Sequence, residues 1–301
     1  MLSKQRIGIL WILIAASGGA TIPIFIRTVY NVSDLHPTDV ALWRFIFATP
    51  LIWILATFTE TRHKKAAEEA IQIKPLLLLG ILFTGAVLAA MVGLQYIAAS
   101  LYVVLYYTYP AMVALISLLL GNRLPLRGWI AITMTLAGVI LTVGDFTEIT
   151  GENPALGILI ALINGLFVAI YLVLIGRIMT RRETVMRSSA WVFSGTLMTL
   201  TLAIPFFGLA IPQNWQTWAA LLGLAILGTI VPIGLINIGI QFIGAARASI
   251  IATIEPVISM LLSTFLLGEI VLPVQWSGAA LIILAVILLE ARTPQRKRKI
   301  A

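Results

Sequence analysis

Long apolar segments separated by short polar ones run through the whole chain. Ten such segments are predicted, each about 20 residues long, which is the length that an α-helix needs to cross the hydrocarbon core of a bilayer. They lie roughly at 6–28, 38–59, 75–97, 101–120, 126–144, 154–177, 187–209, 215–241, 246–268 and 272–291. The longest polar interruption, at 59–74, is too short to form a domain. The pattern therefore predicts one membrane domain with short loops.

These segments are expected to be helices because lipid offers no hydrogen-bond partner to an unpaired backbone N–H or C=O group. A transmembrane barrel would instead show alternating segments of about ten residues. Composition agrees, since 60% of the 301 residues are hydrophobic and only 11% are charged, against about 25% charged in soluble domains. The predicted fold class is an all-α integral membrane protein with ten transmembrane helices.

The basic residues predict the orientation in the membrane. The net charge is +8, but Lys and Arg are scattered between apolar segments, which favours membrane flanks over a surface for nucleic acid. With ten spans and a cytoplasmic N-terminus, all 20 Lys and Arg residues except Arg27 and Arg44 fall on the cytoplasmic side. We therefore expect both termini in the cytoplasm and the protein in the plasma or inner membrane. The basic segment 292–301 is a predicted cytoplasmic tail, which we expect to be an ordinary solvated tail; its charge is better explained by topology and anionic lipid headgroups than by nucleic acid.

The two halves of the chain match one another. GLQYIAASLYVVLYYTYP (93–110) aligns without a gap with GIQFIGAARASIIATIEP (239–256), which pairs Pro110 with Pro256 at an offset of 146 residues. Single matches elsewhere keep the offset within a few residues over the whole half. Each half holds five predicted helices, an odd number, so the second half must lie inverted relative to the first.

Inverted repeats of this size are typical of secondary transporters, in which two similar halves move about a site near the membrane midplane. The repeat predicts a first five-helix unit at 1–144 and a second at 154–291. The N-terminal segment also resembles a signal peptide, because basic residues precede an apolar run and small residues. Its helix has a counterpart in the second half, so we expect it to be retained.

Several motifs resemble those of a known family. The ten spans in two halves, LWRF at 42–45, the short turn before the fourth span and ATIEP…LLGE at 252–269 are similar to the EamA-type drug/metabolite transporters. The resemblance covers nearly the whole chain. It implies an exporter or exchanger of small metabolites, often amino acids or their derivatives, with a central cavity between the halves. Ser17-Gly18 and Phe167 depart from the Trp-containing patterns of such proteins, so the resemblance does not fix the substrate.

Glu255 is one of two ionisable residues well inside the predicted spans. It lies about nine residues into the ninth span, close to the midplane at about 1.5 Å per residue. A charge there is costly and needs an aqueous cavity or a partner. Pro256 and Pro110 each remove one helical hydrogen bond, and matched breaks in inverted halves indicate a transport site.

Two roles are open for Glu255. Because desolvation disfavours its charged form, it could exchange a proton or, while ionised, hold a substrate ammonium. The alternative is a protonated carboxyl group that links two helices by a hydrogen bond.

Tyr102, Tyr106 and Tyr109 are spaced at i, i+4 and i+7, which places them on one face of a continuous helix. Such a stripe could line a cavity and stack on an aromatic or cationic substrate. For Tyr102 the alternative is an interfacial belt residue.

Arg44, the second ionisable candidate, lies about 9 Å inside the second span. It could bind a substrate carboxylate or close an outer gate, or it could extend to the interface or pair with Asp39 or Asp34. Weaker candidates are the amides Asn164, Asn237, Gln241 and Gln95, since buried amides more often link helices than bind ligands.

The sequence contains no signature of an enzyme or a cofactor site. It has no cysteine and only two histidines, which argues against a metal site, and no phosphate-binding loop through which ATP could act. The predicted function is a secondary transporter of a small metabolite that works by alternating access, with the proton as a candidate coupling ion. Two alternatives remain, an integral-membrane transferase with a lipid substrate and a packing subunit that does not transport.

Overall fold

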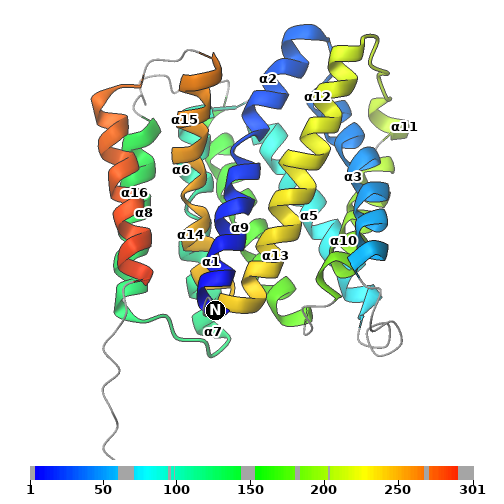
Figure 1. The fold of residues 1–301 in the computed structure, drawn as a ribbon. Coiled ribbons are helices and arrows are strands. Elements are labelled where there is room, and N and C mark those ends of the chain that lie inside the picture. Colours follow the sequence, from blue (N-terminus) through cyan, green and yellow to red (C-terminus); the bar gives the residue numbers. More distant parts are fainter. Residues whose placement is uncertain are drawn as a thin grey trace, which may run out of the picture.

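The fold of the chain is given by a computed structural model (Figure 1). It describes residues 4–59, 71–93, 96–97, 99–143, 153–179, 184–202, 204–267 and 271–290. Throughout these residues the chain forms helices and turns, without a β-strand. The predicted all-α class is therefore confirmed. Gln95 and the basic tail 292–301 lie outside the described residues.

Eight helical stretches are long and apolar enough to cross a membrane. Three are the single helices α3 (Pro37–Thr59), α5 (Ile73–Gly93) and α9 (Pro154–Ile178). The other five join consecutive helices: α1 (Lys4–Gly19) with α2 (Ile22–Val32), α6 (Ala99–Tyr106) with α7 (Tyr109–Leu119), α10 (Val185–Thr201) with α11 (Ile204–Phe207), α12 (Trp215–Ala225) through the π-helix η2 (Ile226–Ile230) with α13 (Val231–Ile243), and α14 (Ala245–Ala252) with α15 (Glu255–Leu267).

Two shorter apolar helices, α8 (Leu126–Val143) and α16 (Pro273–Glu290), occupy the positions of the fifth and tenth predicted spans. The described chain thus has a helical stretch for each of the ten predicted segments, eight of them of membrane-spanning length. The crossing of the membrane by all ten, and their inverted arrangement, stay predictions.

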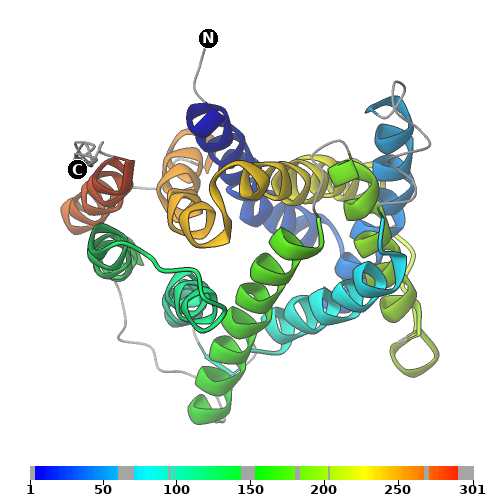
Figure 2. The same cartoon turned by 90° about the horizontal axis from the view of Figure 1, so that it is seen from below.

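Helices from the two halves of the chain pack against each other. The most extensive contacts join α8 with α16, α1 with α13, and α5 with both α9 and α10. Seen from below, the α8–α16 pair stands at one edge of the molecule, next to α14 and α15 (Figure 2). Because every one of these pairs joins residues before 144 with residues after 153, the bundle is stabilised mainly by contacts between the halves.

Glycines allow two of these pairs to approach closely. Where α5 crosses α10, a Cβ atom on Gly195 would lie 2.5 Å from the carbonyl oxygen of Leu77. Where α8 crosses α16, a Cβ atom on Gly278 would lie 2.5 Å from the carbonyl oxygen of Gly138. Both neighbours are backbone atoms that cannot rotate away, so these contacts require glycine, as at the close interfaces of membrane helices.

We expect Gly278→Ala to destabilise the protein by about 1–3 kcal/mol, the usual cost of overpacking a well-packed interface. The measurement is thermal unfolding of the purified protein in detergent. Gly234→Ala is the matched control, because its new methyl group would meet only the flexible Met186 side chain, with Cε at 3.3 Å. If Gly278→Ala unfolds at the same temperature as this control, the α8–α16 contact is not as tight as described.

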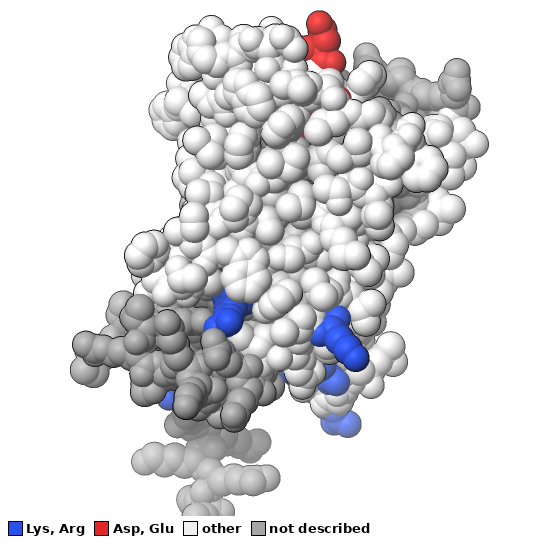
Figure 3. Space-filling view, turned by 90° about the vertical axis from the view of Figure 1, so that its right-hand side faces the viewer, with Lys and Arg blue, Asp and Glu red and all other residues white. Residues whose placement is uncertain are grey.

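Most of the basic side chains visible on one face of the molecule lie at the opposite end from the acidic ones. On the face shown in Figure 3, Lys and Arg gather at the end where α1 begins, and acidic side chains lie at the other end. At that other end the buried Asp39 carboxylate accepts hydrogen bonds from the backbone N–H groups of His36 and Ala210, both at 3.1 Å. The separation of charge agrees with the predicted orientation, in which the basic end faces the cytoplasm.

Candidate functional site

Four of the membrane-length helices are interrupted near their midpoints. The interruptions lie between α1 and α2, between α6 and α7, in the π-helix η2 between α12 and α13, and between α14 and α15. A broken helix leaves backbone groups without their helical partners, and such groups are tolerated within a membrane only where protein or water can satisfy them. The four breaks therefore mark the part of the bundle where a polar site can exist.

Each break has a threonine followed two or three residues later by a proline. Proline has no N–H, so the carbonyl group four residues earlier loses its helical donor. The threonine hydroxyl donates to another carbonyl oxygen of the same broken turn. These bonds join Thr21 to Gly18 at 2.7 Å, Thr108 to Leu105 at 2.7 Å, Thr229 to Leu224 at 2.8 Å and Thr253 to Ile250 at 2.5 Å.

The sequence prediction included the breaks at Pro110 and Pro256 but missed the other two. The signal that could have revealed them is the same in all four places, the sequences TIP (21–23), TYP (108–110), TIVP (229–232) and TIEP (253–256). The two missed breaks are not at matched positions of the repeat, so comparison of the halves did not point to them.

Arg44 of α3 contacts the break in η2. Pro232 leaves the carbonyl oxygen of Gly228 without a helical donor, and Nη2 of Arg44 donates to this oxygen at 2.8 Å. The Nε–H group of Arg44 donates to the Thr229 hydroxyl at 2.5 Å. The pairing of Arg44 with Asp39, left open by the sequence, is not formed, because the Asp39 carboxylate instead binds backbone N–H groups at the acidic end. Arg44 is thus held inside the bundle.

Glu255 is the first residue of α15, and its carboxylate lies against the break between α1 and α2. A Cβ atom on Gly19 would come 2.6 Å from Oε1 of Glu255, so the carboxylate occupies space that glycine leaves open. Within the described part of the chain this carboxylate has no hydrogen-bond donor and no cationic group within 4.0 Å. Arg44 is close enough to interact with it electrostatically. The alternative of a hydrogen bond that links two helices is therefore not observed.

Three tyrosine rings cluster at the break between α6 and α7. The ring centroids of Tyr106, Tyr107 and Tyr109 lie 5.2–5.9 Å apart, and all three side chains lie in the neighbourhood of Glu255. Tyr107 and Tyr109 are buried, whereas Tyr106, like Arg44 and Glu255, keeps some accessible surface. The predicted stripe is wrong in one respect, because α6 ends at Tyr106 and the break turns the chain before Tyr109.

The two buried asparagines link helices. Asn164 of α9 donates to the hydroxyl of Tyr102 on α6 at 2.6 Å. Asn237 of α13 donates to the Tyr171 hydroxyl and to the Ser189 hydroxyl, both at 3.0 Å. Each amide therefore has protein partners that account for its burial, and we assign Tyr102, Asn164 and Asn237 a structural role.

Comparison with known proteins identifies the family. The sequence profile of the EamA-like transporter family matches the chain twice, over residues 6–144 and 155–290. The chain belongs to this family. Proteins named "uncharacterized transporter" in Archaeoglobus fulgidus and in Synechocystis sp. are 28% and 27% identical to it, over 61% and 66% of this chain. The matches cover 64% and 61% of those two proteins, so each spans less than two thirds of the relative.

A solved structure has the same fold. A crystal structure of another protein superimposes on this EamA-like chain with a TM-score of 0.77, covering 95% of this chain and 97% of the other at 18% identity. At this identity the likeness concerns the fold alone. Family membership and the membrane-length helices together identify a multi-pass membrane protein of the EamA-like transporter family.

The site of this EamA-like transporter combines two opposite charges with aromatic rings. The Nη1 group of Arg44 makes no hydrogen bond to the described residues, so it is available to an acceptor. The Glu255 carboxylate is available to a cation or a proton, and Tyr106 lies in its neighbourhood. No group of three or more His, Asp or Glu side chains that could hold a metal ion occurs in the described ranges. The arrangement suits a small zwitterion or cation.

We expect Gly19→Ala to weaken substrate binding about fivefold, because the new methyl group would force Glu255 into a strained rotamer at a cost of about 1 kcal/mol. The measurement is the KM of counterflow in proteoliposomes. Gly234→Ala again serves as the control, since its new methyl group would meet only the flexible Met186 side chain and not the Glu255 carboxylate. An unchanged KM in Gly19→Ala would show that the carboxylate is not held against α1.

Proposed function

We propose that this protein is a secondary active transporter that exports or exchanges small metabolites, such as amino acids or their derivatives, by alternating access. In this proposal ten helices form two inverted five-helix repeats in the cell membrane, with both termini in the cytoplasm. The observation that carries the proposal is the placement of Glu255 and Arg44 at breaks in the middle of membrane-length helices. Paired breaks around a polar site are the usual construction of such transporters.

The two charges suggest which chemical group each residue binds. Glu255 would hold the ammonium group of the substrate, with Tyr106 contributing its aromatic face. Arg44 would use its Nη1 group for the carboxylate, while its bonds to Gly228 and Thr229 keep the guanidinium in place. A hydrogen bond from a fixed, charged guanidinium to a carboxylate oxygen is stronger than one between neutral groups, so this pairing also orients the substrate.

Glu255 also offers a simple means of coupling. One carboxylate can hold a substrate ammonium or a proton, but not both at once. A protonated Glu255 would therefore release a cationic substrate, and the proton would travel in the opposite direction. No second ionisable carboxylate is needed for this exchange.

The experiment is substrate counterflow with the purified protein in liposomes. A panel of amino acids, nucleosides and quaternary cations is tested as the unlabelled partner inside the vesicles. We expect uptake of a labelled compound only when a compound of the same class is inside, and preference for zwitterions or cations. Absence of counterflow with every class would refute the proposal and favour a transferase or a packing subunit. A transferase would then be recognised by conversion of lipid in the same vesicles.

A further inference from the structure

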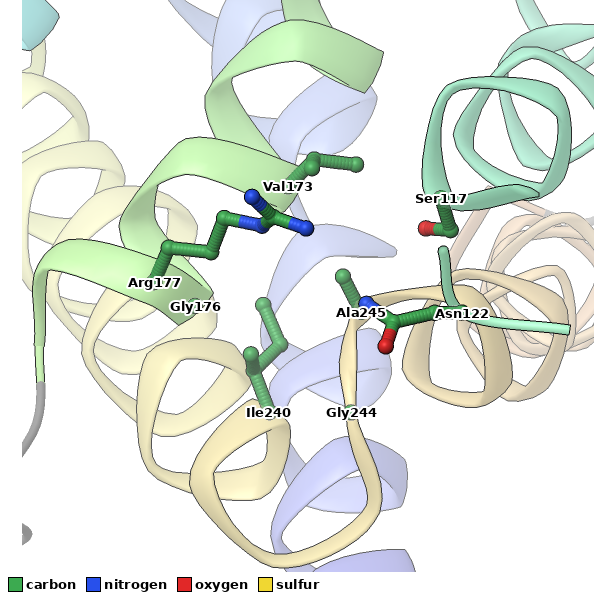
Figure 4. Close-up of a pocket in the computed structure, with 8 residues that line it drawn as sticks. All are labelled: Ser117, Asn122, Val173, Gly176, Arg177, Ile240, Gly244 and Ala245. Atoms are coloured by element: carbon green, nitrogen blue, oxygen red, sulfur yellow. The ribbon is translucent and has the colours of Figure 1, made fainter. Parts of the chain in front are cut away.

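A polar cavity lies at the basic end of the bundle, away from the four breaks. Its volume is about 120 Å³, the space of about four water molecules at about 30 Å³ each. The end of α7, the last turn of α9 and the turn between α13 and α14 enclose it (Figure 4). The cavity therefore lies between the two halves of the chain.

Three polar side chains face this space. In Figure 4 the Arg177 guanidinium, the Ser117 hydroxyl and the Asn122 amide point into the gap between α9 and α7. Nη2 of Arg177 donates to the carbonyl oxygen of Leu120 at 2.9 Å, which fixes the guanidinium and leaves its other N–H groups for the cavity. Ser117 is only 6% exposed, and its hydroxyl has no hydrogen-bond partner among the described residues. The hydroxyl is therefore open to a ligand in the cavity.

The local backbone holds these groups in place. At the end of α7, Gly121 has φ +88°, and the N–H groups of Gly121 and Asn122 donate to the carbonyl oxygens of Leu118 and Ser117 at 3.0 and 2.8 Å. This is a Schellman motif, and it aims the Asn122 side chain back toward the helix it terminates. Gly244, with φ +81°, makes the turn on the opposite wall and adds no side chain there. The glycine turns that end α7 and α13 thus form two walls of the cavity.

The chemistry of the lining favours an anion. The eight lining residues include a guanidinium, a hydroxyl and a carboxamide, all able to donate hydrogen bonds, and no acidic residue. A carboxylate accepts up to four hydrogen bonds and pairs well with a guanidinium. The size of the cavity suits a carboxylate on a short carbon chain.

The cavity is connected to the central site by a helix. α7 begins at Tyr109, beside Glu255, and reaches Ser117 eight residues later, about 12 Å along the axis at about 1.5 Å per residue. α14 on the other wall leads from Ala245 towards the break before Glu255. A molecule that moved from this cavity along these two helices would arrive at the central site.

We propose that this cavity is a second binding site, which takes the carboxylate of the transported molecule at the basic end of the bundle before or after it occupies the Glu255 site. The inference that the cavity lies on the route of the transported molecule rests on the proposed function. The inference that the cavity binds a carboxylate does not. Arg177 carries the charge of this site, and Ser117 and Asn122 complete the hydrogen bonds.

The absence of cysteine from the sequence permits a direct test. An Ala245→Cys variant places one thiol in the cavity wall, and its rate of reaction with a small neutral thiol reagent reports whether the cavity is occupied. The probes are propionate and propionamide at millimolar concentration, which have the same shape but differ in charge. We expect propionate to slow the reaction severalfold and propionamide to have no effect.

Variants in the same background identify the residues. Arg177→Gln should weaken protection by propionate about tenfold or more, because a hydrogen bond between charged groups is lost, and Ser117→Ala should weaken it less. Arg123→Gln is the matched control, an exposed arginine two residues beyond Gly121 that does not line the cavity. Equal protection by the two probes, no protection by either, or full protection in Arg177→Gln would each overturn the proposal.

A second measurement serves if the cysteine variant does not fold. Propionate, but not propionamide, should raise the unfolding temperature of the otherwise unmodified chain, because a ligand that binds only the folded state stabilises it, and Arg177→Gln should remove this effect. Neither readout depends on transport, so a negative result leaves the counterflow test of the proposed function intact. If propionate binds but Arg177→Gln leaves the counterflow KM of carboxylate substrates unchanged, the cavity does not lie on the route.

Discussion

The Glu255→Gln variant is expected to lose proton-driven transport. Glutamine keeps the shape of the side chain but can neither take up a proton nor hold an ammonium group by charge. Loss of one partner of a buried charge pair typically lowers affinity at least about 30-fold, and we expect a decrease of that size for cationic or zwitterionic substrates. The measurement is efflux from proteoliposomes with and without a pH difference across the membrane.

The pH dependence gives the same prediction a second readout. In the unmodified protein a proton competes with the substrate for one carboxylate, so substrate binding should strengthen as the pH rises and the competing proton becomes scarcer. In Glu255→Gln this dependence should disappear. The control is Asp34→Asn, the same chemical change at an exposed position at the acidic end. Efflux that is identical in Glu255→Gln and the unmodified protein at every pH would exclude Glu255 from coupling.

Arg44→Gln is expected to affect both stability and substrate choice. The carbonyl oxygen of Gly228 and the hydroxyl of Thr229 lose their donor, and a buried acceptor left without a partner costs about 1–3 kcal/mol. Transport of carboxylate-bearing substrates should fall at least about 30-fold, since the charge that would pair with the carboxylate is gone. A cation without a carboxylate should be transported nearly as before.

Two further variants separate these effects. Thr229→Val removes one hydrogen-bond partner of Arg44 and the bond from the Thr229 hydroxyl to Leu224, but it keeps the guanidinium charge. It should therefore lower the unfolding temperature and preserve the preference for a carboxylate. Arg27→Gln removes a charge from an exposed position of α2 and should change neither quantity. If Arg44 had only a structural role, Arg44→Gln would lower the stability of the protein and reduce the transport of all substrates equally, with or without a carboxylate. That result would contradict the proposed role of Arg44.

The helices of the candidate site could be predicted from the sequence, but their contacts could not. The breaks at Pro110 and Pro256 could be predicted because each proline removes a helical hydrogen bond and the two prolines lie at matched positions of the two halves. The hydrogen-bond partners of Arg44 could not be predicted, because Gly228 and Thr229 lie more than 180 residues further along the chain. The stripe of Tyr102, Tyr106 and Tyr109 assumed a continuous helix, and the break after Tyr106 invalidates the spacing on which it was based.

The sequence by itself determined that the chain lies in a lipid bilayer, that its fold is all-helical, and to which family it belongs. Apolar segments of membrane-spanning length must be helices in lipid, and a match over both halves of the chain identifies the EamA-like transporters. Only the tertiary structure decided which of the polar groups have partners. It joins Asn164 and Asn237 to other helices, fixes Arg44 on the broken turn of η2, and brings the Glu255 carboxylate against Gly19 without a hydrogen-bond donor among the described residues. The physical reason is that hydropathy depends on each residue alone, whereas satisfaction of a buried polar group depends on helices that are distant in the chain.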